Sequence, residues 1–465
     1  MKKFLTIAVA AVFVLTLAAT TYAVELKASG YLRTRTQLNV NASRDPYAIK
    51  DPTDTMNETY SRMHNRARLK FKLKADENLE GVVYFETDDI YGDLKPDDGK
   101  DQGIPVGADR IDFEVKQAYL SFKVPGLDAY PTRALFGINP TGLGFGNISK
   151  EGAGIRTETK IGTAKLILQY YKALENNALD TYTKADDVDH YCFRVSMPFG
   201  DLTPAVHGNW MHNGRGSIKT VGQTAVSAAS SLYWLGFSLG GKIGPAKVQG
   251  DFTYNGGTVD YRYPVAGVDE DEYGGYVFRA KASIPVDRFE VGAEFFYGSG
   301  DDVDDIPKGE ISGWREVKDA AGYQEQMVYY AGQVSEYAGL ADHMGPDVGS
   351  GEPTGDWMLR VFASTKPLDW MKLTLMGAYM GDNVDNGDRF GTARKADGVT
   401  LEDNSDAGFE IAVMAEMAVY KQLKFEVGAG YLFAGDALDQ WDAVKGKNVT
   451  PDDPWILVTE LKYSF

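Results

Sequence analysis

The chain has 465 residues and a formal net charge of −18 at pH 7, because 48 Lys and Arg stand against 66 Asp and Glu. Basic residues this few and this dispersed argue against a general nucleic-acid-binding protein. The single cysteine, Cys192, excludes an internal disulfide and a metal site built from several cysteines. An apolar share of 43% with 12% aromatic residues argues against a disordered chain, so a large folded protein remains.

Residues 1–23 have the layout of a secretory signal peptide. Lys2 and Lys3 form the charged start, residues 7–19 are apolar, and Thr21-Tyr22-Ala23 offers a cleavage site after Ala23. After this segment no apolar run reaches the roughly 18 residues that a membrane-spanning helix needs. We therefore expect an exported protein in which residues 24–465 form a single domain.

Two segments near the N-terminus alternate with a period of two, which is typical of strands with one apolar face. In residues 25–37 the apolar parity consists of Leu26, Ala28, Gly30 and Leu32. In residues 62–74 it consists of Ala67, Leu69, Phe71 and Leu73. The opposite parity of the two segments carries the basic residues Arg33, Arg35, Arg62, His64, Arg66, Arg68 and Lys70.

The same alternation recurs to the end of the chain, in residues 246–255, 289–298, 409–418 and 455–465. In the last two of these segments the second parity also holds apolar residues. Each segment has the length of a strand and predicts one, so the sequence favours an all-β fold.

The connections between these segments alternate in length. The short ones are residues 75–78, 162, 200–201, 244–245, 285–287, 367–369 and 420–421, and the long ones are residues 39–59, 88–110, 174–189, 213–229, 258–272, 301–355, 382–406 and 435–453. Short turns on one side and long loops on the other are typical of a transmembrane antiparallel β-barrel. The count is about 18 strands. It falls to 16 if residues 155–161 and 164–171 do not form a hairpin that turns at Gly162.

The distribution of charge indicates which face meets lipid. A Lys or Arg at the bilayer midplane costs roughly 2–4 kcal/mol, so the charged parity must face a water-filled lumen and the apolar parity the membrane. Aromatic residues near strand ends fit interfacial girdles, and the chain ends on Phe465, as outer-membrane proteins commonly do. A sheet of 16–18 strands encloses an aqueous channel.

The chain resembles trimeric diffusion porins, and most closely the outer membrane homotrimeric porin family of sulfate-reducing and related bacteria. The segments that carry the resemblance are Val24-Glu25-Leu26-Lys27-Ala28-Ser29-Gly30-Tyr31, Val115-Lys116-Gln117-Ala118-Tyr119-Leu120 and Tyr463-Ser464-Phe465. The resemblance implies passive diffusion of small hydrophilic solutes and ions, a homotrimer, and a third loop folded into the lumen.

The implied third loop corresponds to the glycine-rich stretch after residue 139. A loop that folds back inside a barrel needs tight turns, which glycine permits. An ordinary external loop is the alternative. The residues assigned to this constriction loop are Gly142, Gly144, Gly146, Lys150, Glu151 and Glu158.

The basic residues on the first two strands are expected to line the pore. Carboxylates are needed to screen like charges this close together. Glu86, Glu114, Glu151, Glu158 and Glu294 are the candidates to face them across the lumen, where opposed linings would set a transverse field. The sign of the ion preference stays open, because acidic loops such as residues 301–305 oppose the basic wall.

These features predict an outer-membrane porin with an ion-conducting pore. The expected partners are further copies of the chain, outer-membrane lipid and lipopolysaccharide, with no nucleic acid. The alternative is a channel specific for an oxyanion such as phosphate or sulfate, which would use the arginine row. The sequence contains neither a G-x-S-x-G nor an H-E-x-x-H motif, so we expect no enzyme activity, no cofactor and no metal.

Overall fold

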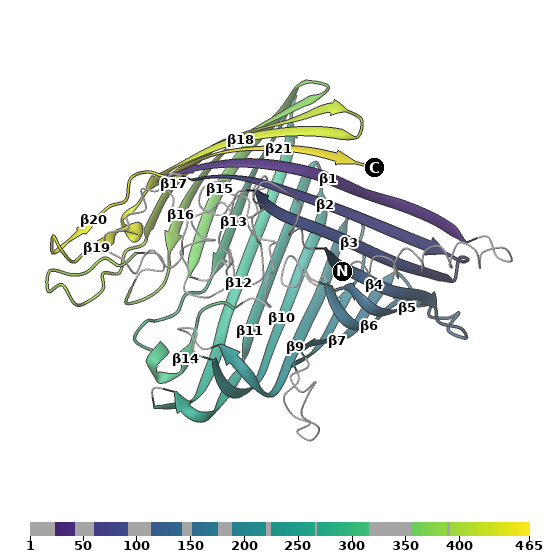
Figure 1. The fold of residues 1–465 in the computed structure, drawn as a ribbon, viewed down its shortest axis with the longest axis horizontal. Helices are drawn as coiled ribbons and strands as arrows, with labels where there is room; N and C mark the ends of the chain where they lie inside the picture. The colour runs from purple at the N-terminus through teal and green to yellow at the C-terminus, as the bar shows by residue number, and fades with distance from the viewer. Residues whose placement is uncertain are drawn as a thin grey trace.

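The regular structure consists of long antiparallel strands that curve around a common axis (Figure 1). The computed structural model describes residues 24–41, 60–91, 113–141, 151–174, 188–219, 225–265, 267–315, 355–387 and 391–465. In these ranges no helix is long and apolar enough to cross a membrane. The predicted signal peptide lies outside the described residues.

The first half of the barrel is built from consecutive hairpins. Its strands are β1 (Glu25–Val40), β2 (Tyr60–Lys74), β3 (Leu79–Tyr91), β4 (Glu114–Lys123), β5 (Thr132–Pro140), β6 (Glu151–Ile161), β7 (Ala164–Leu174), β8 (Val188–Ser196), β9 (Leu202–Lys219) and β10 (Ala225–Ile243).

The second half continues the same meander. Its barrel strands are β11 (Ala246–Val265), β12 (Val268–Val286), β13 (Phe289–Gly298), β15 (Asp356–Leu368), β16 (Met371–Asp382), β17 (Asp406–Tyr420), β18 (Leu423–Ala434) and β21 (Trp455–Ser464). The loops between them add β14 (Glu310–Ile311), β19 (Gln440–Asp442), β20 (Lys447–Val449) and the short 3-10 helices η3 (Ile306–Lys308) and η4 (Asp436–Leu438).

The barrel is closed by pairing of its first and last strands. β1 pairs with β2 on one side and with β21 on the other, so 18 antiparallel strands form a ring. β14 adds a short parallel pairing to β12, and β19 and β20 form a separate hairpin. The predicted hairpin of β6 and β7 is present and turns at Gly162, where φ is +61°. The 18-strand prediction is thus confirmed and the 16-strand alternative is wrong.

The alternation of short turns and long loops holds except at two places. Residues 213–229 and 258–272 were predicted to be long loops, and this prediction is wrong. β9 and β10 leave only residues 220–224 between them, and β11 and β12 leave only residues 266–267. The reason is that polar and glycine-rich segments continue the hydrogen-bonded ladder, although they lack the apolar alternation by which a strand is recognised.

The two faces of the sheet have the predicted character. On β1 the side chains of Leu26 and Leu32 are 56% and 54% exposed on the outside of the barrel. Arg33 and Arg35, which have the opposite parity, are only 6% and 4% exposed. Apolar side chains therefore form the outer surface and charged side chains point inward, as the alternation predicted.

Aromatic residues lie in rows on this outer surface. Tyr170, Tyr191 and Trp210 stack across β7, β8 and β9 with ring centroids 5.4 and 5.2 Å apart. On β21 the rings of Tyr463 and Phe465 stack at 5.7 Å, and Phe465 exchanges two backbone hydrogen bonds with Gly30. These rows match the interfacial girdles of a membrane barrel.

The inner wall also contains two apolar clusters that a purely polar lumen would not have. The larger one, on β13, β15–β18 and β21, includes Phe296, Met358, Met380 and Leu432, together with Leu438 of η4. It accounts for the apolar residues on the second parity of residues 409–418 and 455–465. The loop that contains η4 folds inward and covers this wall, because Leu438 is fully buried there.

Candidate functional site: the inner wall of the barrel

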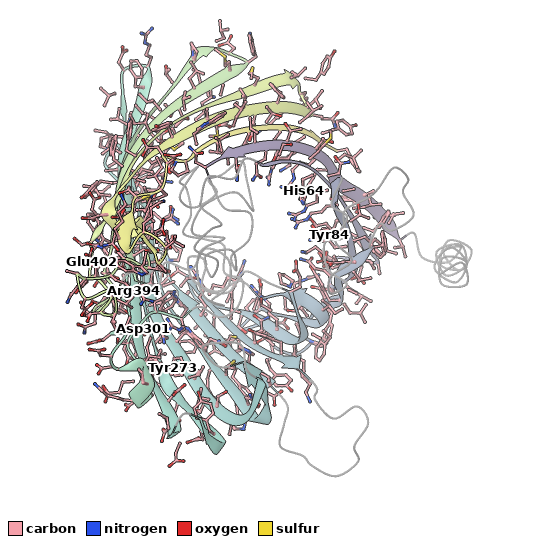
Figure 2. All side chains as sticks on the ribbon, turned by 60° about the vertical axis from the view of Figure 1, so that its left-hand side comes forward. His64, Tyr84, Tyr273, Asp301, Arg394 and Glu402 are labelled. Carbon is pink, nitrogen blue, oxygen red and sulfur yellow. The ribbon has the colours of Figure 1, made fainter. Side chains whose placement is uncertain are left out.

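The basic residues predicted to line the pore lie together on the inner face of β1 and β2. Figure 2 shows His64 of β2 and Tyr84 of the adjacent β3 on the inner side of the ring. Arg33, Arg35, His64 and Arg66 are buried in this wall, whereas Arg68 and Lys70 are partly exposed. Arg62 lies opposite Gln37 in the β1–β2 ladder, and its side chain is outside the described set.

The first carboxylate of the basic wall comes from the last strand. Glu460 of β21 lies directly opposite Arg35, which donates two hydrogen bonds to its Oε2 from Nε (3.0 Å) and Nη2 (2.8 Å). Arg33 Nε lies 3.9 Å from the same oxygen. No local pattern in the sequence identifies Glu460 as a partner of Arg35, because the two residues become neighbours only through closure of the barrel.

The second carboxylate is Glu86 of β3. Its Oε2 pairs with Arg68 and lies 3.6 Å from Arg66 Nε, and its Oε1 accepts a hydrogen bond from Lys116 Nζ at 2.9 Å. Glu86 was predicted to face the basic wall across the lumen, and this is wrong. Antiparallel pairing of β3 with β2 places it beside the arginines on the same wall.

The cations of this wall share their carboxylates. Arg33 and Arg35 contact Glu460, and Arg66, Arg68 and Lys116 contact Glu86. The wall is therefore a dense network of fixed charges on the lumen side of the sheet. Fixed charges attract ions of the opposite sign.

Hydrogen bonds through the neutral side chain of Gln117 connect the edge of the basic wall to β6. Lys70 Nζ donates to Gln117 Oε1 at 3.1 Å and lies 5.2 Å from the ring centre of Tyr84. Gln117 Nε2 donates in turn to Glu151 Oε1 at 3.4 Å. Lys116 lies 3.9 Å from Glu151 as well, so Glu151 belongs to the same charge network.

The predicted constriction loop lies largely outside the described residues. This applies to Gly142, Gly144, Gly146 and Lys150, whereas Glu151 is the first residue of β6. The assignment of Glu158 to this loop is wrong. Glu158 lies inside β6, near the short turn at the opposite end of the strand, and forms ion pairs with Arg156 (2.8 Å) and Lys165 (2.7 Å).

A different loop segment reaches the inner wall. After β13 the chain runs through η3 and β14, and Trp314 is then fully buried against Tyr171, Cys192, Trp234 and Val277. These four residues have inward parity, because their neighbours Tyr170, Tyr191, Tyr233 and Tyr276 are the ones that line the outer surface. Trp314 therefore packs its loop segment against the lumen side of β7–β12.

Polar contacts also attach the segment that contains Trp314 to the inner wall. Asp301 accepts hydrogen bonds from the Gly313 amide (2.6 Å) and from Arg315 Nη2 (2.5 Å), and Trp234 Nε1 donates to the Arg315 carbonyl (2.7 Å). This segment cannot be recognised in the sequence, because a single tryptophan in a long loop carries no periodic signal. Like the loop that contains η4, it packs against the inner wall.

The loop aspartates at positions 301, 302, 304 and 305 do not act together on one partner. Asp301 binds the segment just described, and Asp305 pairs with Lys308 at 2.5 Å. Asp302 accepts hydrogen bonds from Asn386 and the Asp304 amide, and these bonds lower the pKa of Asp302. Throughout the described ranges, no three His, Cys, Asp or Glu side chains are placed so that they could hold one metal ion.

A second buried ion cluster lies on the wall formed by β12, β13 and β15. Glu294 is 1% exposed and binds Arg279 Nε at 2.5 Å and Arg360 Nη2. Lys281 Nζ lies 3.9 Å from the same carboxylate. Glu294 was a candidate to face the basic wall, but its own wall supplies three cations, so acid and base are again paired side by side.

His190 of β8 and His207 of β9 are both buried on the inner wall between these clusters. The ring of His190 stacks on Tyr171 at 4.6 Å, and its Nδ1 shares a hydrogen bond with Asn209 (3.2 Å). Cys192 donates to the same Asn209 oxygen at 3.1 Å and is buried. Cys192 is thus a small residue packed in the inner wall.

Comparison with known proteins gives a likeness of fold. No protein-family model and no curated protein sequence matches the chain. Among solved structures, OccK8 (OprE) of Pseudomonas aeruginosa has a TM-score of 0.53 at 11% identity over 95% of this chain and 98% of that chain. OccAB1 of Acinetobacter baumannii has a TM-score of 0.51 at 11% identity, over 95% and 97%. At such identities the likeness shows the fold alone.

The site and the fold together give the location of the protein. A closed antiparallel ring of 18 strands has an apolar outer surface with aromatic rows and a charged inner wall. This is the construction of a bacterial transmembrane barrel, in which lipid-facing and lumen-facing residues alternate. The chain is therefore a β-barrel of the bacterial outer membrane.

Proposed function

We propose that the protein is a porin that lets small hydrophilic solutes and ions diffuse passively through its lumen. The observation that carries this proposal is the charged inner wall, on which Arg33, Arg35, Arg66, Arg68 and Lys116 lie together with Glu460 and Glu86. A sealed apolar core would not hold so many charged side chains, whereas water and mobile ions in a channel solvate and screen them. An 18-strand barrel is wide enough for such a channel.

A second candidate is a channel specific for an oxyanion such as phosphate or sulfate. It is favoured by one row of the ladder, in which Arg33 lies opposite both Arg66 on β2 and Lys462 on β21. Like charges directly opposite each other destabilise a sheet, and a solute anion bound at this row would add to the screening that Glu460 and Glu86 give Arg33 and Arg66. Arginine is well suited to bind oxyanions because its donors match them in pairs.

Conductance in planar bilayers distinguishes the two candidates. A general porin gives a single-channel conductance that rises in proportion to bulk KCl. A specific channel saturates, and millimolar phosphate or sulfate reduces its chloride current. A barrel with a plugged lumen, which would serve a structural or adhesive role, gives no conductance, and this result would contradict both candidates.

We further propose that the protein is a homotrimer, as its resemblance to trimeric porins implies. The outer surface of β1, β2 and β21 supports this, because it carries hydrogen-bonded polar pairs in the middle of the apolar belt. Thr36 pairs with Thr459 and Thr34 donates to Asn65, both at 2.6 Å, between the girdle residues Trp455 and Tyr463. In a membrane, small and polar residues of this kind favour contact with protein over contact with lipid.

The trimer is tested by adding bulk at this seam. Thr36→Trp is expected to convert trimers into monomers in mild detergent, as read by native mass spectrometry, while the barrel stays folded. The matched control is Val413→Trp, on the outer face of β17 away from the seam. An equal trimer content in both variants would exclude this seam as the contact surface.

The proposal also includes export of the chain and the role of the third loop. Cleavage after Ala23 predicts a mature protein whose first residue is Val24, which N-terminal sequencing of the membrane-purified protein reads directly. The glycine-rich residues 142–146 are proposed to narrow the lumen beside Glu151. Lipopolysaccharide is the proposed lipid partner of the outer leaflet.

A further inference from the structure

A groove of about 680 Å³ lies on the outer surface of the barrel, over β6 to β10. Its walls are almost wholly apolar and include Leu168, Trp210 and Leu235, which are exposed on the outside of the ring. The volume lies within the range of about 300–1,000 Å³ that ligand pockets usually have. The groove is therefore a hollow in the surface that faces the membrane.

Two neighbouring rows of the strand ladder form the groove, each with one residue from β7, β8, β9 and β10. The lower row consists of Leu168, Phe193, Gly208 and Leu235. The upper row, which is farther from the short turns, consists of Tyr170, Tyr191, Trp210 and Tyr233. An apolar row thus lies directly beneath a row of aromatic side chains.

The glycine of the lower row shapes the hollow. A Cβ at Gly208 would lie 2.5 Å from Phe193 Cε1 and 2.9 Å from Leu235 Cδ2. The two flanking side chains therefore lie over the bare backbone of β9, below the ring of Trp210. A larger residue at position 208 would have to displace them and would fill the groove.

The upper edge of the groove is polar. The Tyr170 hydroxyl donates to Asp189 Oδ1, and Trp210 Nε1 donates to Ser231 Oγ, both at 2.9 Å. Asp189 and His212 lie opposite each other in the next row of the ladder. Aromatic side chains with an apolar body and a polar tip mark the boundary between lipid chains and lipid headgroups.

The groove belongs to the outer leaflet. Its strands are joined by short turns at Gly162, Gly200 and Gly244, and short turns lie on the periplasmic side of such barrels. The polar edge points the other way, toward the extracellular side. In Figure 1, β7, β9 and β10 lie away from β1 and β21, so the groove stays in contact with lipid in the proposed trimer.

We propose that this groove binds one acyl chain of lipopolysaccharide. The chain lies on Leu168, Phe193 and Leu235 beneath the ring of Trp210, and the headgroup lies at the row of Asp189 and His212. Lipid tails are as apolar as the groove, so the preference comes from van der Waals packing in a hollow that flat parts of the belt do not offer. The proposal rests on lipopolysaccharide as the lipid partner in the proposed function, and it does not depend on conduction.

The test titrates hexa-acylated lipid A, the membrane anchor of lipopolysaccharide, into the purified full chain in mild detergent and reads bound lipid by native mass spectrometry. Gly208→Leu fills the groove and is expected to raise the Kd of the first lipid A about tenfold, equivalent to about 1.4 kcal/mol. The matched control is Gly81→Leu on the outer face of β3, where the nearest atom to a Cβ is Leu120 Cδ2 at 3.8 Å. Equal Kd values in the two variants would overturn the proposal.

A second variant leaves the glycine in place. Trp210→Ala removes the upper wall of the groove and is expected to raise the Kd of lipid A severalfold. Its control is Trp357→Ala, which removes a tryptophan from the outer face of β15 and is expected to keep the wild-type Kd. Circular dichroism confirms that each variant keeps its strands. A wild-type Kd in folded Trp210→Ala would count against the groove.

Two further arms identify the occupant. Dioleoylphosphatidylglycerol, whose unsaturated chains are kinked, is expected to bind without dependence on Gly208. A Gly208-dependent affinity equal to that of lipid A would refute the choice of lipopolysaccharide. A loss of trimers in Gly208→Leu, with lipid A still bound as in wild type, would show that a second copy of the chain occupies the groove and would also refute it.

Conductance of the wild-type protein in KCl separates this proposal from the pore function. If the protein conducts no KCl and Gly208→Leu weakens the binding of lipid A, the groove stands and the pore function fails. If the protein conducts KCl and lipid A binds wild type and Gly208→Leu alike, the groove is wrong and the pore function stands. If wild type binds no lipid A, both the groove and the lipid partner are wrong.

Discussion

Arg33 and Arg66 lie directly opposite each other across the β1–β2 ladder. Both are buried, and each reaches a different carboxylate, Glu460 for Arg33 and Glu86 for Arg66. The basic wall therefore consists of two ion networks that meet at a ladder position where two like charges lie opposite each other. Each of the two carboxylates serves at least two cations.

Reversing charge on this wall should change the ion preference. Arg66→Glu/Arg68→Glu replaces two positive charges of the wall with two negative ones, so the reversal potential in a KCl gradient is expected to move toward cation preference. The physical reason is that fixed charges in a lumen concentrate ions of the opposite sign. The measurement is the zero-current potential of the reconstituted channel.

The matched control for this variant reverses two lysines in external loops. Lys308 and Lys445 have side chains that are 61% and 62% exposed, and each pairs only with a nearby aspartate. Lys308→Glu/Lys445→Glu is expected to shift the potential much less, since salt screens exposed charges within about 10 Å at 0.1 M. Equal shifts in both double variants would sink the claim that Arg66 and Arg68 set the preference.

Removing the buried carboxylate of β13 should destabilise the barrel. Glu294→Gln removes the carboxylate that both Arg279 and Arg360 bind, and these two side chains are 3% and 2% exposed. Breaking a buried ion pair by removing one partner costs about 3–5 kcal/mol. The free energy of unfolding from urea titration in lipid or detergent should fall by that amount.

A partly exposed ion pair provides the comparison for Glu294. Glu416 pairs with Lys372 at 2.9 Å, and their side chains are 28% and 40% exposed. Glu416→Gln is expected to cost about 0–1 kcal/mol. A loss for Glu294→Gln no larger than this would show that solvent reaches the Glu294 cluster.

The packing of Trp314 should protect its loop segment from protease. Trp314→Ala empties the space between Tyr171, Trp234 and Val277, a change that costs about 3–5 kcal/mol for a buried tryptophan. The segment then detaches from the wall more often, so trypsin is expected to cleave after Lys308 faster than in the wild type. Cleavage is followed by mass spectrometry of the folded protein.

The control for this loop is an aromatic residue of another loop. Trp441 lies on β19, whose hairpin with β20 is separate from the barrel sheet. Trp441→Ala should leave cleavage after Lys308 at the wild-type rate. Unchanged cleavage in Trp314→Ala would mean that the polar contacts of Asp301 hold the segment alone.

The loop turn at Asp397 should be sensitive only to strong acid. Its carboxylate accepts hydrogen bonds from the Thr400 hydroxyl and from the amides of Val399 and Thr400, which lower the pKa of Asp397 to about 2. Because the folded pKa is below the usual 3.8, the turn is fully stabilised above pH 3.8 and loses this contribution as the pH falls through about 2.

Hydrogen exchange measures this effect. The Val399 and Thr400 amides are expected to stay protected at pH 4 and to lose protection toward pH 2. In Asp397→Asn the protection should be weaker and should not change between these values. A wild-type loss of protection already near pH 4 would contradict the lowered pKa.

The sequence was sufficient to predict the barrel, because the alternation of apolar and polar residues along a strand indicates which side chains face lipid and which face the lumen. Arg33 and Leu32 differ in exposure as their parity predicted, and the short turns at Gly162, Gly200 and Gly244 all have positive φ. The strand segments within residues 213–229 and 258–272 of β9–β12 were wrongly predicted to be loops. Their pairing depends on backbone hydrogen bonds to neighbouring strands, and these bonds do not require an alternating pattern of side chains.

Of the charged residues on the inner wall, only the basic ones were correctly placed from the sequence. The basic residues of β1 and β2 share one local pattern, which made them visible in the sequence. Their partners Glu460 and Glu86 become neighbours only through closure of the ring and through strand register. The packing of Trp314 depends on inward-facing residues from β7, β8, β10 and β12, which no local window of sequence contains.

The pairing of β1 with β21 also has a consequence for assembly. Arg35 and Glu460 are 425 residues apart, and the backbone of Phe465 bonds to that of Gly30. Until the last strand arrives, β1 and β18 each present an unpaired edge, which is a template for pairing with another chain. Closure must therefore come late, so the exported chain needs protection of both edges throughout the time in which the other hairpins form.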